Sequence, residues 1–270
     1  MNRNMQQGPN RPSFSRRPFL MGLAGAFMAG CLAPLPDSGA PATTSPTPAD
    51  VSSADVDETP PWTMVELITD GRQTFLAQIQ AEIQQMGTPQ HHCFREWTLG
   101  GHLWQGEELV YADRRILFLQ AARAGGRSAI RLTDDSSGKW TETALEAILP
   151  EPAEETPPAD AAIQFVRARR QPDGKWAFDV TLRHEDRGWD DYADGWHVAT
   201  VEGEILGTRV LLHPHEQEQP FTRSLGPISI PPQVQQVVIR SHDLVSGYTA
   251  ETVLVPLGQA ANEARYLVER

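Results

Sequence analysis

The sequence predicts a mainly β protein in which a small α+β domain precedes a seven-stranded antiparallel β-sandwich. Three observations predict this fold class. Short runs in which apolar and polar side chains alternate with a period of two dominate residues 161–257. Residues 62–149 contain one segment of helical periodicity followed by strand-like runs. An acidic, proline-rich linker over 150–160 separates the two blocks, and each block is long enough to bury its own core.

The first 30 residues have the features of an export signal. Four arginines lie among them, and an apolar run at 19–28 is too short to span a bilayer. The stretch Ser15-Arg16-Arg17-Pro18-Phe19-Leu20 resembles the twin-arginine export signal at every defined position. The stretch Met28-Ala29-Gly30-Cys31 resembles a bacterial lipobox. This resemblance implies that Cys31 is diacylated and becomes the first residue of the mature protein.

Residues 31–61 form the lipidated cysteine and a tether rich in Pro, Ala, Ser and Thr, which holds the folded part away from the membrane. Leu32, rather than Asp, follows Cys31, and in a Gram-negative cell this implies sorting to the outer membrane. Residues 1–30 contain four arginines and no acid, so their removal changes the formal net charge from −12 to −16. Such a chain is poorly suited to nucleic acid and better suited to cationic ligands.

The first block predicts one long helix and a small sheet. Thr63 and Glu66 have the spacing of a capping box, so the helix is expected from about 64 to 86, with Gly87 as its C-terminal cap. Cys93 is expected to be a buried small hydrophobic residue, although His91 and His92 beside it also allow a metal or reactive-thiol site. Strand-like runs are at 94–99, 108–111, 116–121 and 128–132, and a short helix is expected at 142–149.

The second block predicts strands joined by short turns. The strands are expected at 162–169, 174–184, 195–202, 207–213, 220–229, 234–242 and 250–257. Seven short strands in about a hundred residues are typical of a sandwich of immunoglobulin or fibronectin type III character. With Cys31 lipidated, Cys93 is alone, so the antibody-type disulfide is excluded. A helix is the candidate structure for the C-terminal tail, 258–270.

Three stretches of the second block carry a resemblance: GWDDYADGW at 188–196, LGTRVLLHPH at 206–215 and EQPFTRSL at 218–225. They resemble an immunoglobulin- or fibronectin-III-like domain of bacterial exported proteins that has no assigned activity. The resemblance covers about 160–257. It implies an exported sandwich domain and carries no catalytic residue to this chain.

Histidines at three strand ends are predicted to meet at one pole of the sandwich. Antiparallel strands joined in succession alternate in direction, so the second, fourth and sixth strands end together. Imidazole and carboxylate groups gathered there are typical ligands of copper or zinc. Pro214 ends the strand between two of the histidines and stiffens their spacing. The predicted metal ligands are His184, His213, His215, His242, Asp191 and Asp194.

Two other interpretations of this pole stay open. The histidines and carboxylates could form a polar network that clamps the loops without a metal. The aromatic residues of the loops could form a ligand-binding surface, for example for carbohydrate, because sugar faces stack on exposed rings. The predicted ligand-binding residues are Trp189, Tyr192, Trp196 and Tyr248.

The sequence does not predict an enzyme. Ser241, His242 and Asp243 have the residue types of a hydrolytic triad, but contiguous strand residues alternate between faces and cannot align as nucleophile, base and orienter. The chain contains no Gly-rich phosphate loop, CxxC pair or HExxH helix. No catalytic residue is therefore assigned.

Together these features predict a lipid-anchored protein of the bacterial cell envelope, on its periplasmic or outer-membrane side. Its non-catalytic sandwich is expected to act as a binding or interaction module through the His/Asp/aromatic pole. The alternatives are a copper- or zinc-handling lipoprotein and a carbohydrate-binding protein. The expected partners are the membrane, through the lipid anchor, and an envelope protein or a small cationic ligand, with nucleic acid excluded.

Overall fold

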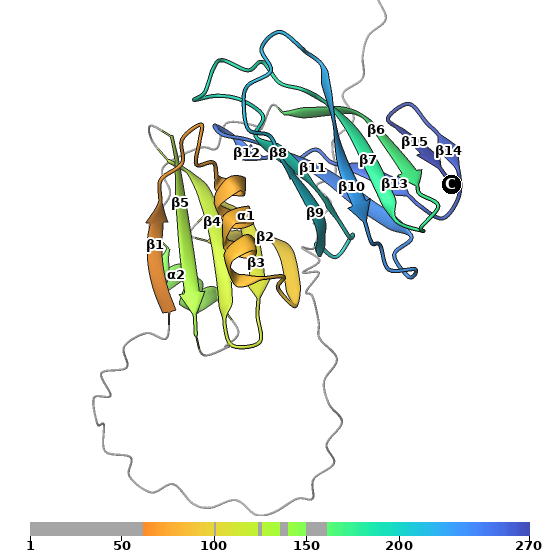
Figure 1. The fold of residues 1–270 in the computed structure, drawn as a ribbon. Helices are drawn as coiled ribbons and strands as arrows, with labels where there is room; N and C mark the ends of the chain where they lie inside the picture. The colour runs from red at the N-terminus through yellow and green to blue at the C-terminus, as the bar shows by residue number, and fades with distance from the viewer. Residues whose placement is uncertain (1–61, 100, 124–125, 136–139, 150–160) are drawn as a thin grey trace, which may run out of the picture.

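A computed structural model of the chain describes residues 62–99, 101–123, 126–135, 140–149 and 161–270. The predicted export signal, the predicted lipidation site Cys31, the tether and the acidic linker lie outside the described residues. The fold is mainly β, as predicted, with a small α+β domain followed by a β-sandwich (Figure 1). Among the described helices, none combines the length and the hydropathy needed to cross a bilayer.

The first domain is built on a five-stranded antiparallel sheet in the order β1-β5-β4-β3-β2. Successive strands from β2 to β5 are neighbours, so this part is a meander, and β1 pairs with β5 at the edge. The strands are β1 (Trp62–Leu67), β2 (His91–Leu99), β3 (His102–Val110), β4 (Arg115–Arg123) and β5 (Gly126–Asp134).

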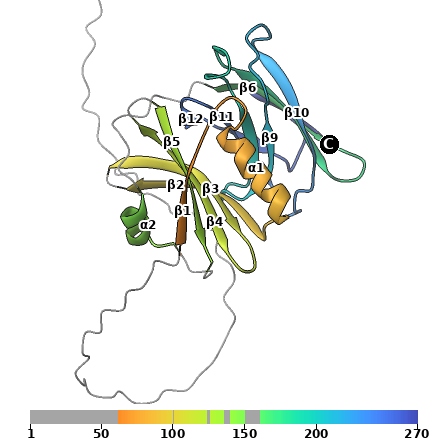
Figure 2. The ribbon, with the colours of Figure 1, turned by 60° about the vertical axis from the view of Figure 1, so that its left-hand side comes forward.

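Two helices cover opposite faces of this sheet (Figures 1 and 2). Helix α1 (Phe75–Met86) packs Phe75, Leu76 and Ile79 on the face that presents Ile116 and Phe118 of β4. The alternate residues of β4 point to the other face, where α2 (Glu142–Ile148) supplies Leu145 and Ile148. Alternate side chains of β4 therefore contribute to two separate apolar cores, one on each face of the sheet.

The prediction of one helix from 64 to 86 is wrong in its first part. Residues 62–67 form strand β1, and α1 begins after Thr74, whose Oγ1 accepts a hydrogen bond from the amide of Ala77 (3.2 Å). The capping residue is therefore Thr74 rather than Thr63. Leu67 and Ile68 fit the helical spacing, but residues 62–67 form a strand because they pair with β5, which lies far along the chain.

The second domain is a sandwich of two mostly antiparallel sheets. One has the order β10-β7-β6-β15-β14, and the other the order β12-β11-β8-β9, with β13 also paired to β11. Large apolar side chains between the sheets form the core, including Phe178, Val180, Trp196 and Ile239. The strands are β6 (Ala162–Arg170), β7 (Trp176–Arg183), β8 (Gly195–Ala199), β9 (Ile205–Val210), β10 (Phe221–Ile228), β11 (Gln236–Asp243), β12 (Gly247–Tyr248), β13 (Val253–Pro256), β14 (Ala261–Asn262) and β15 (Tyr266–Glu269).

The seven predicted sandwich strands correspond to β6–β11 and β13, but the expected helical tail is wrong. Residues beyond 257 form β14 and β15, and β15 lies parallel to β6 with Val268 opposite Ala168. The side chain of Val268 is buried in the sandwich core. This strand is added at the open edge of β6, which a prediction from local periodicity could not foresee.

The outer face of the β8–β11 sheet is covered by the first domain. Along these strands Trp196 and Ile239 point into the sandwich, while the alternate residues His197, Arg240 and His242 point outward. Cys93 of β2, buried as predicted, pairs with the turn between β8 and β9 through an isolated bridge. The two domains therefore share a buried seam that contains polar side chains.

Candidate functional site

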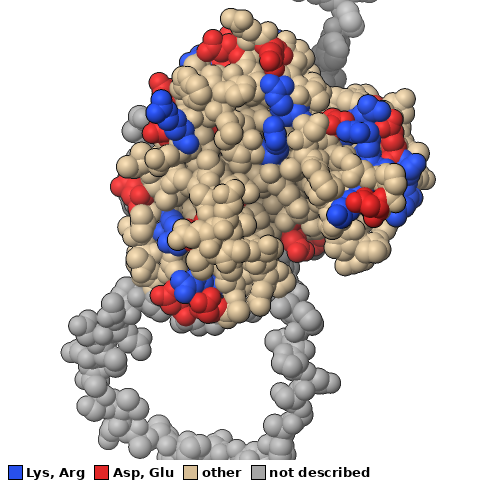
Figure 3. Space-filling model, in the orientation of Figure 1, with Lys and Arg blue, Asp and Glu red and all other residues tan. Residues whose placement is uncertain are grey.

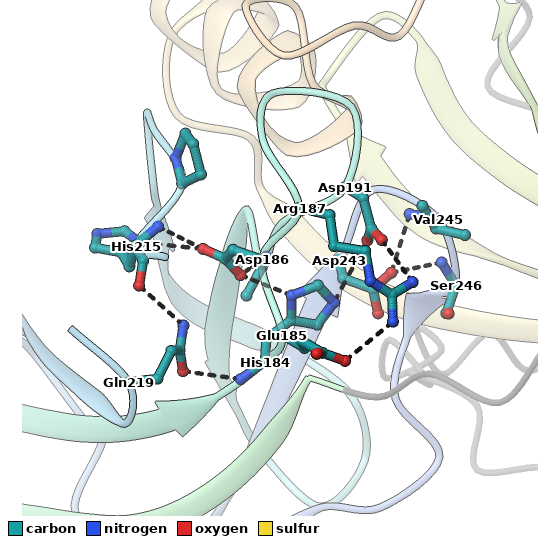
Figure 4. Close-up of polar contacts among 12 residues, drawn as sticks. His184, Glu185, Asp186, Arg187, Asp191, His215, Gln219, Asp243, Val245 and Ser246 are labelled. Carbon is teal, nitrogen blue, oxygen red and sulfur yellow. Dashed lines mark hydrogen bonds and ion pairs between the residues drawn. The ribbon is translucent and has the colours of Figure 1, made fainter. Parts of the chain in front are cut away.

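The ends of β7 and β11 meet at one pole of the sandwich, as their common direction predicts. His184 directly follows β7, and Asp243 is the last residue of β11. The loop between β7 and β8 adds Asp186 and Asp191, and Figure 4 shows these four side chains gathered beside one another. His215 reaches the same pole from the segment after β9.

Asp186 fixes the orientation of the His184 ring. Its Oδ1 lies 2.7 Å from Nδ1 of His184, and both residues are buried. The same carboxylate accepts hydrogen bonds from the backbone amides of His215 (2.5 Å) and Ala193 (3.3 Å). Burial opposes ionisation of Asp186, but its hydrogen bonds with His184 and with the two amides lower its pKa below the ordinary value.

With Nδ1 engaged, Nε2 of His184 faces two further carboxylates. It lies 3.7 Å from Oδ1 of Asp191. One ligand atom from each of His184, Asp191 and Asp243 can be chosen so that all three lie within 4.8 Å of one another. Asp243 is held by its Oδ1, which accepts from the amides of Val245 (3.0 Å) and Ser246 (2.5 Å). We call His184, Asp191 and Asp243 the pole triad.

The other predicted ligands do not join this triad. His213 is exposed, and its ring lies 4.5 Å from that of His215. His215 is buried and stacks on Phe221 at 4.0 Å, with its Nδ1 3.8 Å from Asp186. Burial, with the nearby positive charge of Arg223, lowers the pKa of His215. These two histidines border the site through Asp186.

His242 and Asp194 lie on the opposite face of the β8–β11 sheet. Nδ1 of His242 pairs with Oδ1 of Asp194, and its Nε2 lies 2.6 Å from the side-chain nitrogen Nε2 of Gln120 in the first domain. The sequence argument placed the strand end correctly but did not use the alternation of side chains to choose between His242 and Asp243 as the residue that faces the pole. The predicted cluster of four imidazoles is therefore wrong, and Asp243, next in the chain, takes the place of His242.

The seam between the domains contains a second polar cluster, which the sequence did not predict. Glu107 of β3 is fully buried, and its carboxylate lies 2.6 Å from Nε2 of His92 and 3.7 Å from Nδ1 of His197. The hydroxyl of Tyr248 donates to the same carboxylate at 2.5 Å. We call Glu107, His92, His197 and Tyr248 the seam cluster. A pair of adjacent glutamates in the middle of β3 was the sequence signal.

Electrostatics in the seam cluster favour an ionised glutamate and a neutral tyrosine. Burial alone would raise the pKa of Glu107, but His92 and His197 lower it well below its ordinary range. Burial and the charge of Glu107 raise the pKa of Tyr248 well above its ordinary value. Burial also lowers the pKa of His197. The cluster thus holds a buried carboxylate that depends on its neighbours for compensation.

Three of the four predicted ligand-binding aromatics are buried, so the predicted aromatic surface is wrong. Tyr192 and Trp196 are fully covered, and Tyr248 belongs to the seam cluster. The hydroxyl of Tyr192 donates to the carbonyl of Gly71 in the first domain (3.1 Å). Trp189 differs from them, because 54% of its surface is exposed.

Comparison with known proteins gives one informative similarity. No family model matches the chain, and no solved structure matches it. Over 87 residues the chain is 45% identical to a protein of Halomicrobium mukohataei named "Putative lipoprotein". The matched stretch is 32% of this chain and 42% of that protein, so the chain matches less than half of its relative's length. The name of this relative agrees with the lipoprotein character predicted from the sequence.

Proposed function

We propose that this chain is a lipid-anchored cell-envelope protein whose sandwich is a non-catalytic binding module, and that the module binds a divalent metal ion through the pole triad. One observation carries the proposal. An imidazole nitrogen and two carboxylates from three separate segments converge within 4.8 Å at the end of the sandwich. The segments are the end of β7, the loop that follows it, and the end of β11.

The spacing of the pole triad is close to that of a zinc site. Nitrogen and oxygen ligands bind zinc at 2.0–2.2 Å in a tetrahedral arrangement, which places neighbouring ligand atoms about 3.4 Å apart. The distance from Nε2 of His184 to Oδ1 of Asp191 is 3.7 Å. Side-chain movements of less than about 1 Å therefore suffice to bring the ligand atoms around an ion.

The surroundings of His184 support the same function. Histidine ligands of metals generally donate their second ring nitrogen to a carboxylate, which fixes the tautomer and makes the ligand nitrogen more basic. Asp186 occupies this position at 2.7 Å from Nδ1. The backbone amide of His184 donates to Oε1 of Gln219, which adds a further restraint on its place at the strand end (3.1 Å).

The ligand set favours zinc over copper. A cluster of several imidazoles would suit Cu(II), whereas one imidazole with two carboxylates suits Zn(II) and leaves a fourth position for water or for an exchanging ligand. Asp191 provides the access route, because 22% of its side chain is exposed while His184 is buried. Such a site is suited to binding or buffering an ion.

Zinc titration of the purified full chain tests this function. We expect one zinc ion per chain by calorimetry, and at least a tenfold loss of affinity in His184→Ala and in Asp191→Asn. His213→Ala is the matched control, because His213 is exposed and outside the triad, and it should bind as the wild type does. Stoichiometric binding that persists in His184→Ala, or no binding at all, would reject the metal function.

The lipid anchor is supported by the lipobox and by the name of the Halomicrobium relative. The chain contains two cysteines, Cys31 and Cys93, which permits a matched pair of variants. We expect Cys31→Ser to abolish incorporation of labelled palmitate and to move the protein to the soluble fraction. Cys93→Ser should stay labelled and in the membrane fraction. Labelling that survives Cys31→Ser would exclude this anchor.

The expected partners follow from charge. On the face shown in Figure 3, acidic and basic side chains are interspersed, and no broad basic region lies among the described residues of that face. The full chain also has a formal net charge of −12, so it repels polyanions such as nucleic acid. A cation at the pole, rather than nucleic acid, is the ligand that this composition favours.

A further inference from the structure

A hollow of about 360 Å³ lies where a loop of the first domain meets a loop of the sandwich. Its lining includes Asp70, Gly71 and Arg72 from the turn between β1 and α1, and Trp189 from the loop between β7 and β8. We infer that this hollow binds a neutral sugar ring, stacked on the indole of Trp189 and hydrogen-bonded by Asp70 and Arg72. Its volume is within the range of small-ligand sites.

The indole of Trp189 has the exposure and the support that stacking requires. It is the single aromatic residue among the large exposed hydrophobic residues of the described chain, and 54% of its surface is exposed. Its ring meets that of Tyr192 edge to face, with centroids 6.3 Å apart and an interplanar angle of 84°. Tyr192 is buried, and its hydroxyl donates a hydrogen bond to the carbonyl of Gly71. The ring against which Trp189 packs is therefore held in place.

Gly71 allows the two loops to meet. A Cβ atom at this position would lie 2.6 Å from the carbonyl oxygen of Trp189 and 2.9 Å from its Cβ, too close for any other residue without movement of the loop. The turn is further held by Asp70, whose Oδ1 accepts from the amides of Arg72 (2.8 Å) and Gln73 (2.9 Å). The hollow is therefore formed by the packed domains before any ligand arrives.

The polar lining distinguishes between classes of ligand. The hydrogen bonds from the backbone amides of Arg72 and Gln73 lower the pKa of Asp70, so this carboxylate is ionised at neutral pH. Its Oδ2 and the guanidinium of Arg72 make no hydrogen bond to a described residue. An anionic ligand would be repelled by the carboxylate of Asp70, and a cationic ligand would be repelled by the guanidinium of Arg72. Hydroxyl groups can donate to the carboxylate and accept from the guanidinium at once, so a neutral polyhydroxylated ligand fits both.

This site is separate from the pole triad, although both use the loop between β7 and β8. It depends on Asp70 and Arg72 of the first domain, which a prediction confined to the sandwich could not include. Sugar binding by the wild-type chain should therefore be the same with and without added zinc. The two proposals can then fail independently.

Calorimetry with the full chain tests the inference. The probes are cellohexaose and chitohexaose as neutral glycans, hexagalacturonate as an anionic glycan, and the chitosan hexamer as a cationic one. We expect saturable binding of at least one neutral glycan and weaker or no binding of the charged ones. Trp189→Ala should lower the affinity at least tenfold, and Arg72→Gln about threefold or more.

Two controls accompany these variants. Leu212→Ala removes an exposed apolar side chain, 71% accessible, outside the hollow, and the wild-type chain is titrated with and without zinc. In both cases the neutral glycan should bind as it does to the untreated wild type. The inference is overturned if neither neutral glycan binds, if a charged glycan binds more tightly than both neutral ones, or if Trp189→Ala binds unchanged.

Discussion

Replacing Tyr248 by phenylalanine tests whether the seam cluster stabilises the packing of the two domains. The hydroxyl of Tyr248 donates to the carboxylate of Glu107 at 2.5 Å, and both groups are buried. A hydrogen bond to a charged group contributes about 1.5–3 kcal/mol, and its loss leaves a buried carboxylate with one donor fewer. We therefore expect Tyr248→Phe to lower the free energy of unfolding by about 2 kcal/mol.

Urea denaturation, followed by tryptophan fluorescence, measures this loss through a lower midpoint at an unchanged slope. Tyr266→Phe is the control, because Tyr266 is partly exposed and its hydroxyl bonds to no described residue. It should change stability by less than about 0.5 kcal/mol. In a double-mutant cycle with Glu107→Gln, the coupling should exceed about 0.5 kcal/mol. A cost for Tyr248→Phe equal to that of the control would refute this account of the seam.

The remaining predictions concern pH and packing. In the folded chain the pKa of Glu107 lies below its ordinary 4.5, and the pKa of His197 lies below its ordinary 6.5. The contribution of each group to the free energy of unfolding is therefore complete above its ordinary pKa and is lost as the pH falls below that value. Urea midpoints should thus fall from pH 7 to pH 3, and Glu107→Gln should flatten the part between pH 4.5 and pH 3; a midpoint that rises on acidification would contradict this. Gly106→Ala would place a Cβ 1.8 Å from the carbonyl oxygen of Phe118, and its urea midpoint should report a loss of about 3 kcal/mol. Gly258→Ala, which meets only a side chain, should cost less than about 1 kcal/mol, and equal costs would contradict the packing argument.

The strands of the sandwich were predictable because the patterns that specify them lie within short stretches of the sequence. Alternation along Trp176, Phe178 and Val180, together with turn residues between the runs, places each strand near its observed limits. Strands β1 and β15 were missed because each depends on a distant partner. Leu67 of β1 pairs with Ala129, and Val268 of β15 with Ala168, and no local period distinguishes such segments from a helix or a tail.

The candidate site was predictable to the level of the strand end. Chain direction correctly brings the ends of β7 and β11 together, so His184 and the end of β11 were expected at one pole. Which residue of β11 faces the pole depends on the parity of the strand, and here Asp243 faces it while His242 meets Gln120. The seam cluster could not be predicted, because Glu107 and Tyr248 are 141 positions apart and belong to different domains.

The most direct test of the central claim is X-ray absorption at the zinc edge of the zinc-loaded full chain. We predict nitrogen or oxygen ligands at about 2.0–2.1 Å with the outer-shell scattering of a single imidazole, and the loss of that imidazole signal in His184→Ala. Scattering from two or more imidazoles, or from sulfur, or a spectrum unchanged by His184→Ala, would show that the ion is not held by His184, Asp191 and Asp243.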